Sequence, residues 1–244
     1  MLEEQFNNYV SNYDMNDKDI KLKYDHSFRV MKLQEKYAKE LGFSKEDIEI
    51  AKIIGLLHDF GRFEQLRVYH TYDDFNSIDH ADYSVEQLFD KNEIDKFKIN
   101  KEWYPIIKYA IKNHNKKDLE PCTDERTLMH ARLIRDVDKL DIIFLFTEYD
   151  DYKELTGDEP ISEVVMESIR NHHQVSKKDR KNRNDHIVTK MAFVFDVNSD
   201  IVLKKIKGYY KKYYKKLNNK IFEEAYNIVM KYIDERLGKN ERIR

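Results

Sequence analysis

Apolar residues recur three and four positions apart along most of the chain, and this spacing predicts helices joined by short connections. The first long helix is expected over residues 26–41, with Gly42 in the place of a stop signal. Ser44 stands in the N-cap position of a second helix, which should end near Gly61. Residues 60–79 are polar and poorly periodic, so they predict the longest irregular connection in the first half of the chain.

Further helices are expected on both sides of a break at Gly157 and Pro160. Before the break, helices are predicted over residues 80–89 and 101–116, and Asp124 can cap a longer helix that carries Leu140. After it, helices over residues 161–171 and 185–197 are separated by a charged run, residues 177–185, that should stay solvated. Two C-terminal helices carry apolar stripes, made by Ile206, Tyr210, Tyr213 and Leu217 and then by Phe222, Ala225, Val229 and Ile233.

The composition favours an all-α fold. The 244 residues include only three Pro and six Gly, which are too few turn-forming residues for a β-sandwich or β-barrel. Hydrophobic residues make up 41% of the chain, and 17 Tyr and 13 Phe supply bulk for a sizeable core. We therefore predict an all-α helical bundle with one core over residues 1–150, followed by a C-terminal helical extension over residues 151–244 that packs on the same core.

The charge pattern and the apolar runs limit the expected partners and location. The net charge of −2 gives no whole-molecule attraction to nucleic acid or membrane, so neither is an expected partner. The Tyr-Lys tract at residues 209–217 is interpreted as a helix with a tyrosine core face and a lysine solvent face. Cys122 is the single cysteine, and the longest apolar run, residues 142–146, is too short to span a bilayer. A cytoplasmic protein is expected.

Several common catalytic motifs are absent from the sequence. The positions of the six Gly exclude both GxGxxG and the P-loop pattern. No GxSxG elbow, HExxH motif or metal-type cysteine pair is present. Histidine and aspartate remain as the candidates for chemistry.

Four histidines and two aspartates fall on the expected core faces of successive helices. They are His26, His58, Asp59, His80, His114 and Asp138, with Asp141 one turn beyond Asp138. A lone histidine on an apolar face is more often a hydrogen-bonded core residue than a ligand. Together, however, these residues favour a metal site, because burying each one unsatisfied costs about 1–3 kcal/mol and a shared ion removes that cost. Imidazoles with carboxylates suit Fe, Mn, Co, Ni or Zn. The histidines outside this set are His70, His130, His172, His173 and His186.

The pattern resembles the HD-domain metal-dependent phosphohydrolase superfamily. The resemblance covers residues 24–141 and rests on His26, the LLHDFGR segment at residues 56–62, His80, His114 and the DVDKLD segment at residues 136–141. It implies that His26, His58, Asp59 and Asp138 hold a first divalent ion. It also implies that Asp59 bridges to a second ion held by His80 and His114. The implied reaction is hydrolysis of a phosphate ester by a metal-activated water, with Asp59 and Arg62 as catalytic residues.

Two basic residues are candidates for binding the substrate, a phosphate ester such as a nucleotide. The guanidinium fork of Arg62 suits a pair of phosphoryl oxygens, although a surface arginine at a helix end fits its position equally well. Lys139 can neutralise charge on the substrate or merely pair with a carboxylate. Two other functions remain open. One is a diiron oxygenase, since HD-fold relatives similar to myo-inositol oxygenase use the same ligand positions; the other is a non-catalytic nucleotide-binding sensor.

Overall fold

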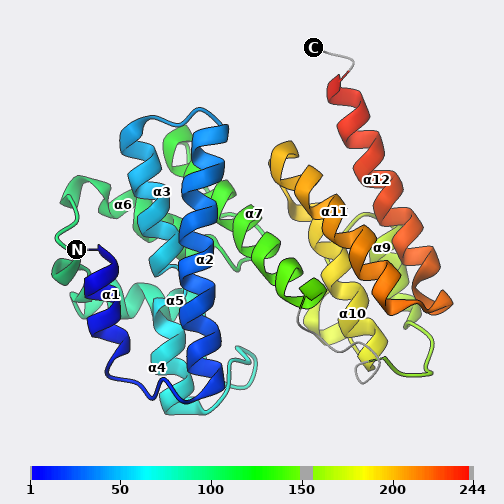
Figure 1. Ribbon diagram of the computed structural model, residues 1–244, viewed down its shortest axis with the longest axis horizontal. Helices are drawn as coiled ribbons and strands as arrows, with labels where there is room; N and C mark the ends of the chain where they lie inside the picture. The colour runs from blue at the N-terminus through cyan, green and yellow to red at the C-terminus, as the bar shows by residue number, and fades with distance from the viewer. Residues whose placement is uncertain (1, 149–155, 242–244) are drawn as a thin grey trace. The chain divides into compact units, whose positions relative to one another are not determined.

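The computed structural model describes residues 2–148 and 156–241, and within them every regular element is a helix (Figure 1). The all-α prediction is therefore confirmed. The contacts divide the chain into two compact units, Met1–Val137 and Asp138–Arg244. The proposed arrangement of residues 1–150 and 151–244 around one core stays a prediction. No helix within the described ranges combines the length and apolarity needed to cross a membrane.

The first unit is built from seven α-helices, the last of which continues into the second unit. They are α1 (Leu2–Val10), α2 (Lys18–Glu40), α3 (Lys45–Leu57), α4 (Phe60–Tyr69), α5 (His80–Val85), α6 (Tyr104–Asn113) and α7 (Glu125–Glu148). A π-helical turn (Glu86–Asp90) extends α5, and short 3-10 turns (Glu93–Phe97 and Lys101–Trp103) lead into α6.

Side-chain caps fix where several of these helices begin. The predicted caps are confirmed: Ser44 Oγ accepts a hydrogen bond from Asp47 N at 3.0 Å, and Asp124 Oδ2 accepts one from Thr127 N at 3.0 Å. The expected start of the first long helix at residue 26 is wrong. Asp17 caps α2 by accepting from Asp19 N at 2.8 Å, so the helix begins two turns earlier.

The expected irregular connection over residues 60–79 is wrong for its first half, which forms α4. Phe60 and Phe63 are fully buried, and Tyr9 of α1 stacks on Phe60 with ring centroids 3.8 Å apart. In the sequence, Gly61 and Arg62 separate these two aromatic residues and the polar pair Glu64 and Gln65 follows, so the segment shows no clear apolar period. Packing against α1 stabilises the helix. Only residues 70–79 form a loop, and α3 ends at Leu57 rather than near Gly61.

Two glycines bring the helices of this unit close together. A Cβ on Gly55 would lie 2.9 Å from Met31 Cα, so α3 packs directly on α2 only because that atom is absent. A Cβ on Gly61 would lie 2.6 Å from Ser84 N, which sets the approach of α4 to α5. The segment between these glycines, which contains His58 and Asp59, is thereby held between α2 and α5.

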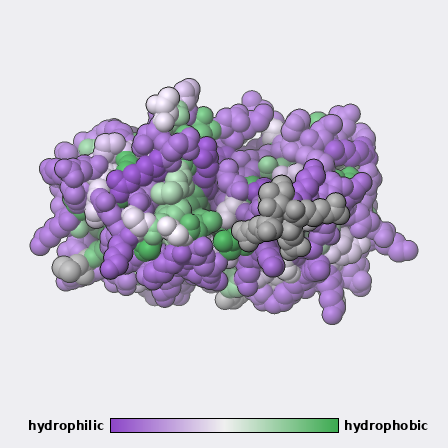
Figure 2. Space-filling view, turned by 90° about the horizontal axis from the view of Figure 1, so that it is seen from above, coloured by the Kyte–Doolittle hydropathy of each residue, from purple (hydrophilic) through white to green (hydrophobic). Residues whose placement is uncertain are grey.

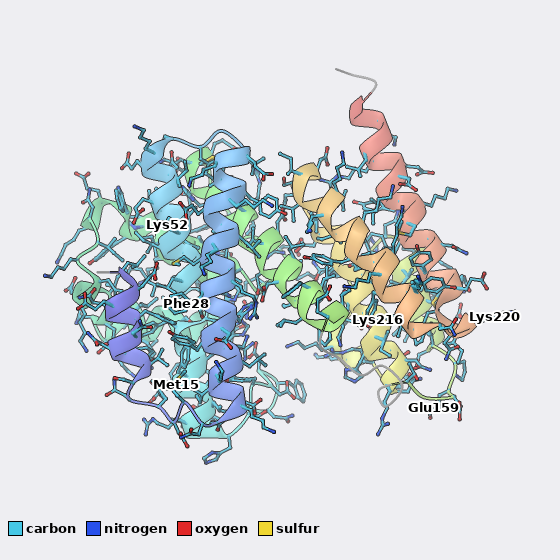
Figure 3. All side chains as sticks on the ribbon, viewed as in Figure 1. Met15, Phe28, Lys52, Glu159, Lys216 and Lys220 are labelled. Atoms are coloured by element: carbon cyan, nitrogen blue, oxygen red, sulfur yellow. The ribbon has the colours of Figure 1, made fainter. Side chains whose placement is uncertain are left out.

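The second unit contains α9 (Glu163–Arg170), α10 (Arg183–Met191), α11 (Asp200–Leu217) and α12 (Glu223–Glu241), with the last part of α7. The apolar stripes expected on the last two helices are buried, which confirms those predictions. The tyrosine core face is confirmed as well: Tyr210 and Tyr213 are buried, whereas Lys215 and Lys216 are exposed, the latter labelled in Figure 3. Hydrophilic residues cover most of the surface seen in Figure 2, as expected for a chain with 37% charged residues.

The charged run at residues 177–185 is not wholly solvated as expected. Its last residue, Asp185, is buried and forms a capping box with Asn182 at the start of α10. The same carboxylate accepts hydrogen bonds from Ser162 N at 2.8 Å and from Ser162 Oγ at 2.7 Å. These hydrogen bonds stabilise the buried Asp185 carboxylate, which the sequence pattern predicts to be exposed to solvent.

Candidate metal centre

Five of the predicted ligands lie in the first unit, at or near helix ends that bring them together. His26 is within α2, His80 is the first residue of α5, and His114 follows the last residue of α6. His58 and Asp59 link α3 to α4. All five residues are buried, with exposed fractions between 0% and 7%. Asp59 occupies the N-cap position of α4 but makes no capping hydrogen bond, so its carboxylate is directed elsewhere.

The two oxygens of Asp59 face two different pairs of imidazoles. Oδ2 lies 3.5 Å from Nε2 of His26 and 3.6 Å from Nε2 of His58. Oδ1 lies 3.6 Å from Nε2 of His80 and 3.7 Å from Nε2 of His114. Each oxygen with its pair of imidazoles could hold one metal ion, since the ligand atoms of each group lie within 4.8 Å of one another.

The other ring nitrogens show which tautomers these histidines adopt. Nδ1 of His58 lies 2.9 Å from the carbonyl oxygen of Gly55, and Nδ1 of His114 lies 2.7 Å from that of Ile111. Carbonyl oxygens only accept, so Nδ1 carries the hydrogen in both rings. Nδ1 of His80 donates likewise to Asp74 Oδ2 at 2.6 Å. In the neutral rings, Nε2 is therefore left with a lone pair, as a metal ligand requires.

Nε2 of His80 and Nε2 of His114 lie 3.0 Å apart. Both carry lone pairs in the neutral tautomers, so their contact is repulsive unless a cation, either a proton or a metal ion, lies between them. The nearby Asp59 Oδ1 is buried and has no hydrogen-bond partner. A shared metal ion would satisfy all three atoms together.

Residues 24–143 match the family model of the HD domain. The chain contains an HD domain. The match confirms the resemblance stated from the sequence, and it includes every residue of the predicted ligand set. No curated protein and no solved structure matches the chain.

The charge states of this part of the HD domain suit metal ligands. Burial on its own would raise the pKa of Asp59, but the Lys23 ammonium and the neighbouring imidazoles outweigh it and hold that pKa well below its usual range. Burial, together with the Arg62 guanidinium, lowers the pKa of His80 from 6.5 to about 4. At pH 7 the site therefore presents an anionic carboxylate and a neutral imidazole.

Asp138 and Lys139 follow the end of the first unit along α7. Asp138 is half-buried and is the first residue of the second unit. Its role as a ligand of the first ion stays a prediction. Lys139 is buried, and its Nζ lies 2.6 Å from Asp196 Oδ2 within the second unit. This ion pair is the alternative that the sequence left open, and the role of Lys139 in substrate binding stays a prediction.

Arg62 reaches the centre of the HD domain while bound to the loop at residues 70–79. Its Nη1 donates to the carbonyl oxygen of Tyr72 at 2.7 Å and to Asp74 Oδ1 at 2.8 Å. Its Nε is buried without a hydrogen-bond partner and lies 3.7 Å from Asp59 Oδ1. The Arg62 guanidinium is thus held beside the Asp59 carboxylate and is not exposed on the surface.

Two charged residues of this site, Lys23 and Asp74, were not predicted from the sequence. Lys23 Nζ donates to Asp59 Oδ2 at 2.7 Å, and its side chain is only 18% exposed. Its position one turn before His26 on the same helix face is a signal that could have identified it. Asp74 accepts from His80 and Arg62, but it lies in an irregular loop, where no periodicity marks it.

A buried arginine also positions His114. Arg135 of α7 donates from Nη1 to the carbonyl oxygen of Asn113 at 2.8 Å and from Nη2 to that of Lys117 at 3.0 Å. These bonds satisfy carbonyl groups at and beyond the C-terminal end of α6. The segment that carries His114 is therefore tied to α7 on both of its sides.

Proposed function

We propose that this HD domain is the catalytic domain of a metal-dependent phosphohydrolase that cleaves a phosphate ester such as a nucleotide. The observation that carries the proposal is the facing pair of imidazoles, His80 and His114, with the unpartnered oxygen of Asp59 beside them. Such a set of buried acceptors requires a cation, and the family to which the domain belongs is one of metal-dependent hydrolases.

The donor set fits divalent transition metals. His26, His58, Asp59 and Asp138 would hold a first ion, and Asp59, His80 and His114 a second one. Neutral imidazole nitrogens with carboxylate oxygens suit Fe, Mn, Co, Ni or Zn, and no thiolate is among them. When bound, the ions would supply Lewis-acid activation of a water and stabilise negative charge that develops on the ester.

The residues of the chain would orient an anionic substrate at this centre. Lys23 and Arg62 bring two cationic groups to the two oxygens of Asp59, and Arg62 Nε has no hydrogen-bond acceptor. A phosphoryl group can accept hydrogen bonds from both cations, whereas an uncharged substrate offers them no anionic acceptor. This arrangement favours a phosphate ester over the neutral substrate of an oxygenase.

The experiment is metal analysis of protein purified without chelator, followed by a phosphate-release screen over nucleotides and sugar phosphates. We expect release that needs Mn(II), Co(II) or another bound divalent metal, stops with a chelator, and does not need dioxygen. Dioxygen consumption by the iron form would instead identify an oxygenase. Nucleotide binding without turnover, whichever metal is supplied, would identify a sensor.

A further inference from the structure

The loop at residues 70–79 contributes one carboxylate that joins a proposed ligand to the rest of the site. Asp74 Oδ2 accepts from Nδ1 of His80 at 2.6 Å. Asp74 Oδ1 accepts from Arg62 Nη1 at 2.8 Å and from Gln65 Nε2 at 3.2 Å. The Asp74 side chain is only 14% exposed, so these protein groups, more than water, satisfy its charge.

A second group competes for the same nitrogen of His80. Asn115 Nδ2 lies 3.3 Å from Nδ1 of His80, and it also donates to Asp79 Oδ1 at 3.1 Å. The bond to Asp79 keeps the amide nitrogen, a donor, on this side of Asn115. If Asn115 were the only partner of Nδ1, that nitrogen would have to accept, and the ring hydrogen would move to Nε2.

The two partners therefore favour opposite tautomers of His80. With the hydrogen on Nδ1, the lone pair on Nε2 faces Nε2 of His114 at 3.0 Å and can ligate a metal ion. With the hydrogen on Nε2, the ring has no lone pair to offer there. We propose that Asp74 is a positioning residue that selects the metal-binding tautomer of His80 over the tautomer favoured by Asn115. The inference deepens the metal centre of the proposed function and rests on it.

Asp74→Asn is the most informative variant, because it keeps the size of the side chain. In this variant, the single amide oxygen would accept the hydrogen bonds from Arg62 Nη1 and Gln65 Nε2. The amide NH₂ group would then face Nδ1 of His80 and donate to it. The variant should therefore move the ring hydrogen of His80 from Nδ1 to Nε2. Asp73→Asn is the matched control. The Asp73 carboxylate accepts hydrogen bonds from within the loop, from Phe75 N at 3.1 Å and from Asn76 Nδ2 at 2.7 Å.

The first measurement is the tautomer of His80 in metal-free, ¹⁵N-labelled protein, read from long-range ¹H–¹⁵N spectra and assigned with His80→Ala. We expect the Nδ1–H form in the wild type and in Asp73→Asn, and the Nε2–H form in Asp74→Asn. The second measurement is calorimetric titration with Co(II). The affinity for the second ion should fall about 10- to 100-fold in Asp74→Asn and stay unchanged in Asp73→Asn. Adding Asn115→Ala to Asp74→Asn should restore part of the affinity.

The outcomes separate this inference from the proposed function. An unchanged tautomer with unchanged affinity in Asp74→Asn overturns the role of Asp74, and so does an equal loss in Asp73→Asn, which would mean that only loop structure matters. If Asp74→Asn fails to fold, the Asp74→Ser variant is read in the same way, since its short hydroxyl cannot keep all three bonds. A wild type that binds no metal refutes the metal centre itself, while the tautomer spectra still test Asp74.

Discussion

Replacing Asp59 by asparagine keeps the shape of the side chain and removes the charge on which the centre depends. In the metal-free protein, the Lys23 ammonium, 2.7 Å from Asp59 Oδ2, loses its counter-charge. The two side chains are 18% and 4% exposed. Removing one partner of a buried ion pair costs about 3–5 kcal/mol, and because Lys23 keeps some contact with water we expect a loss of about 3 kcal/mol.

The assay is urea unfolding at pH 7 in the presence of a chelator. With an m-value of about 1.5 kcal/mol per molar, a loss of 3 kcal/mol lowers the midpoint by about 2 M. Metal content, measured after purification without chelator, should fall at both sites, because the two oxygens of Asp59 face the two pairs of imidazoles. Activity should be lost with the metal.

Asp47→Asn is the matched control for this experiment. Asp47 Oδ1 lies 2.6 Å from Arg126 Nε and 3.1 Å from His130 Nε2, so it too is a charge-paired carboxylate of the first unit. Neither partner of Asp47 in these two contacts is a proposed metal ligand. We expect this variant to lose about 1 kcal/mol and keep its metal. An Asp59→Asn protein that keeps both ions, or that unfolds at the wild-type urea concentration, would refute the reasoning.

Three further predictions test other parts of the site. His114→Ala should lower the metal content from two ions towards one; an unchanged metal count in a merely destabilised protein would make His114 an ordinary core residue. Arg62→Lys should lower kcat/KM on a phosphate ester about tenfold for each 1.4 kcal/mol lost, with metal content unchanged, and wild-type kcat/KM in this variant would remove Arg62 from substrate binding. Burial would raise the pKa of Asp47, but hydrogen bonds from Ser44, Arg126 and His130 lower it from 3.8 to about 2. Its stabilising effect should therefore be complete above about pH 5 and be lost as the pH falls towards 2, and Asp47→Asn should flatten that part of the unfolding free energy measured against pH.

Two of the proposed ligands, His58 and His114, could be identified from the sequence because each stands out against an apolar helix. His114 continues the stripe of Ile107, Ala110 and Ile111, all of which are buried, and His58 directly follows the buried Leu57. A polar residue at such a position must find a partner, and the helical period gives its direction before any contact is known.

The partners of these ligands could not be identified in the same way. Asp74 lies in an irregular loop, where hydrogen bonds to Arg62 and His80 determine its position rather than a repeating pattern. The tautomer of His80 depends on those bonds and on Asn115, which is distant in sequence. The helix α4 escaped prediction for a related reason, since the burial of Phe60 depends on its stacking with Tyr9.

The net charge of the chain also concealed the local charge of the site. Lys23 and Arg62 balance Asp59 and Asp74 in the metal-free protein, each through an ion pair within the site. Divalent ions bound to His26, His58, His80 and His114 would add positive charge that neutral imidazoles do not compensate, and Asp138 would offset only one unit of it. Because unbalanced charge is costly in a buried site, the loaded centre needs an anion. A phosphate ester provides that anion, and a neutral substrate would leave the charge to be compensated by solvent ions.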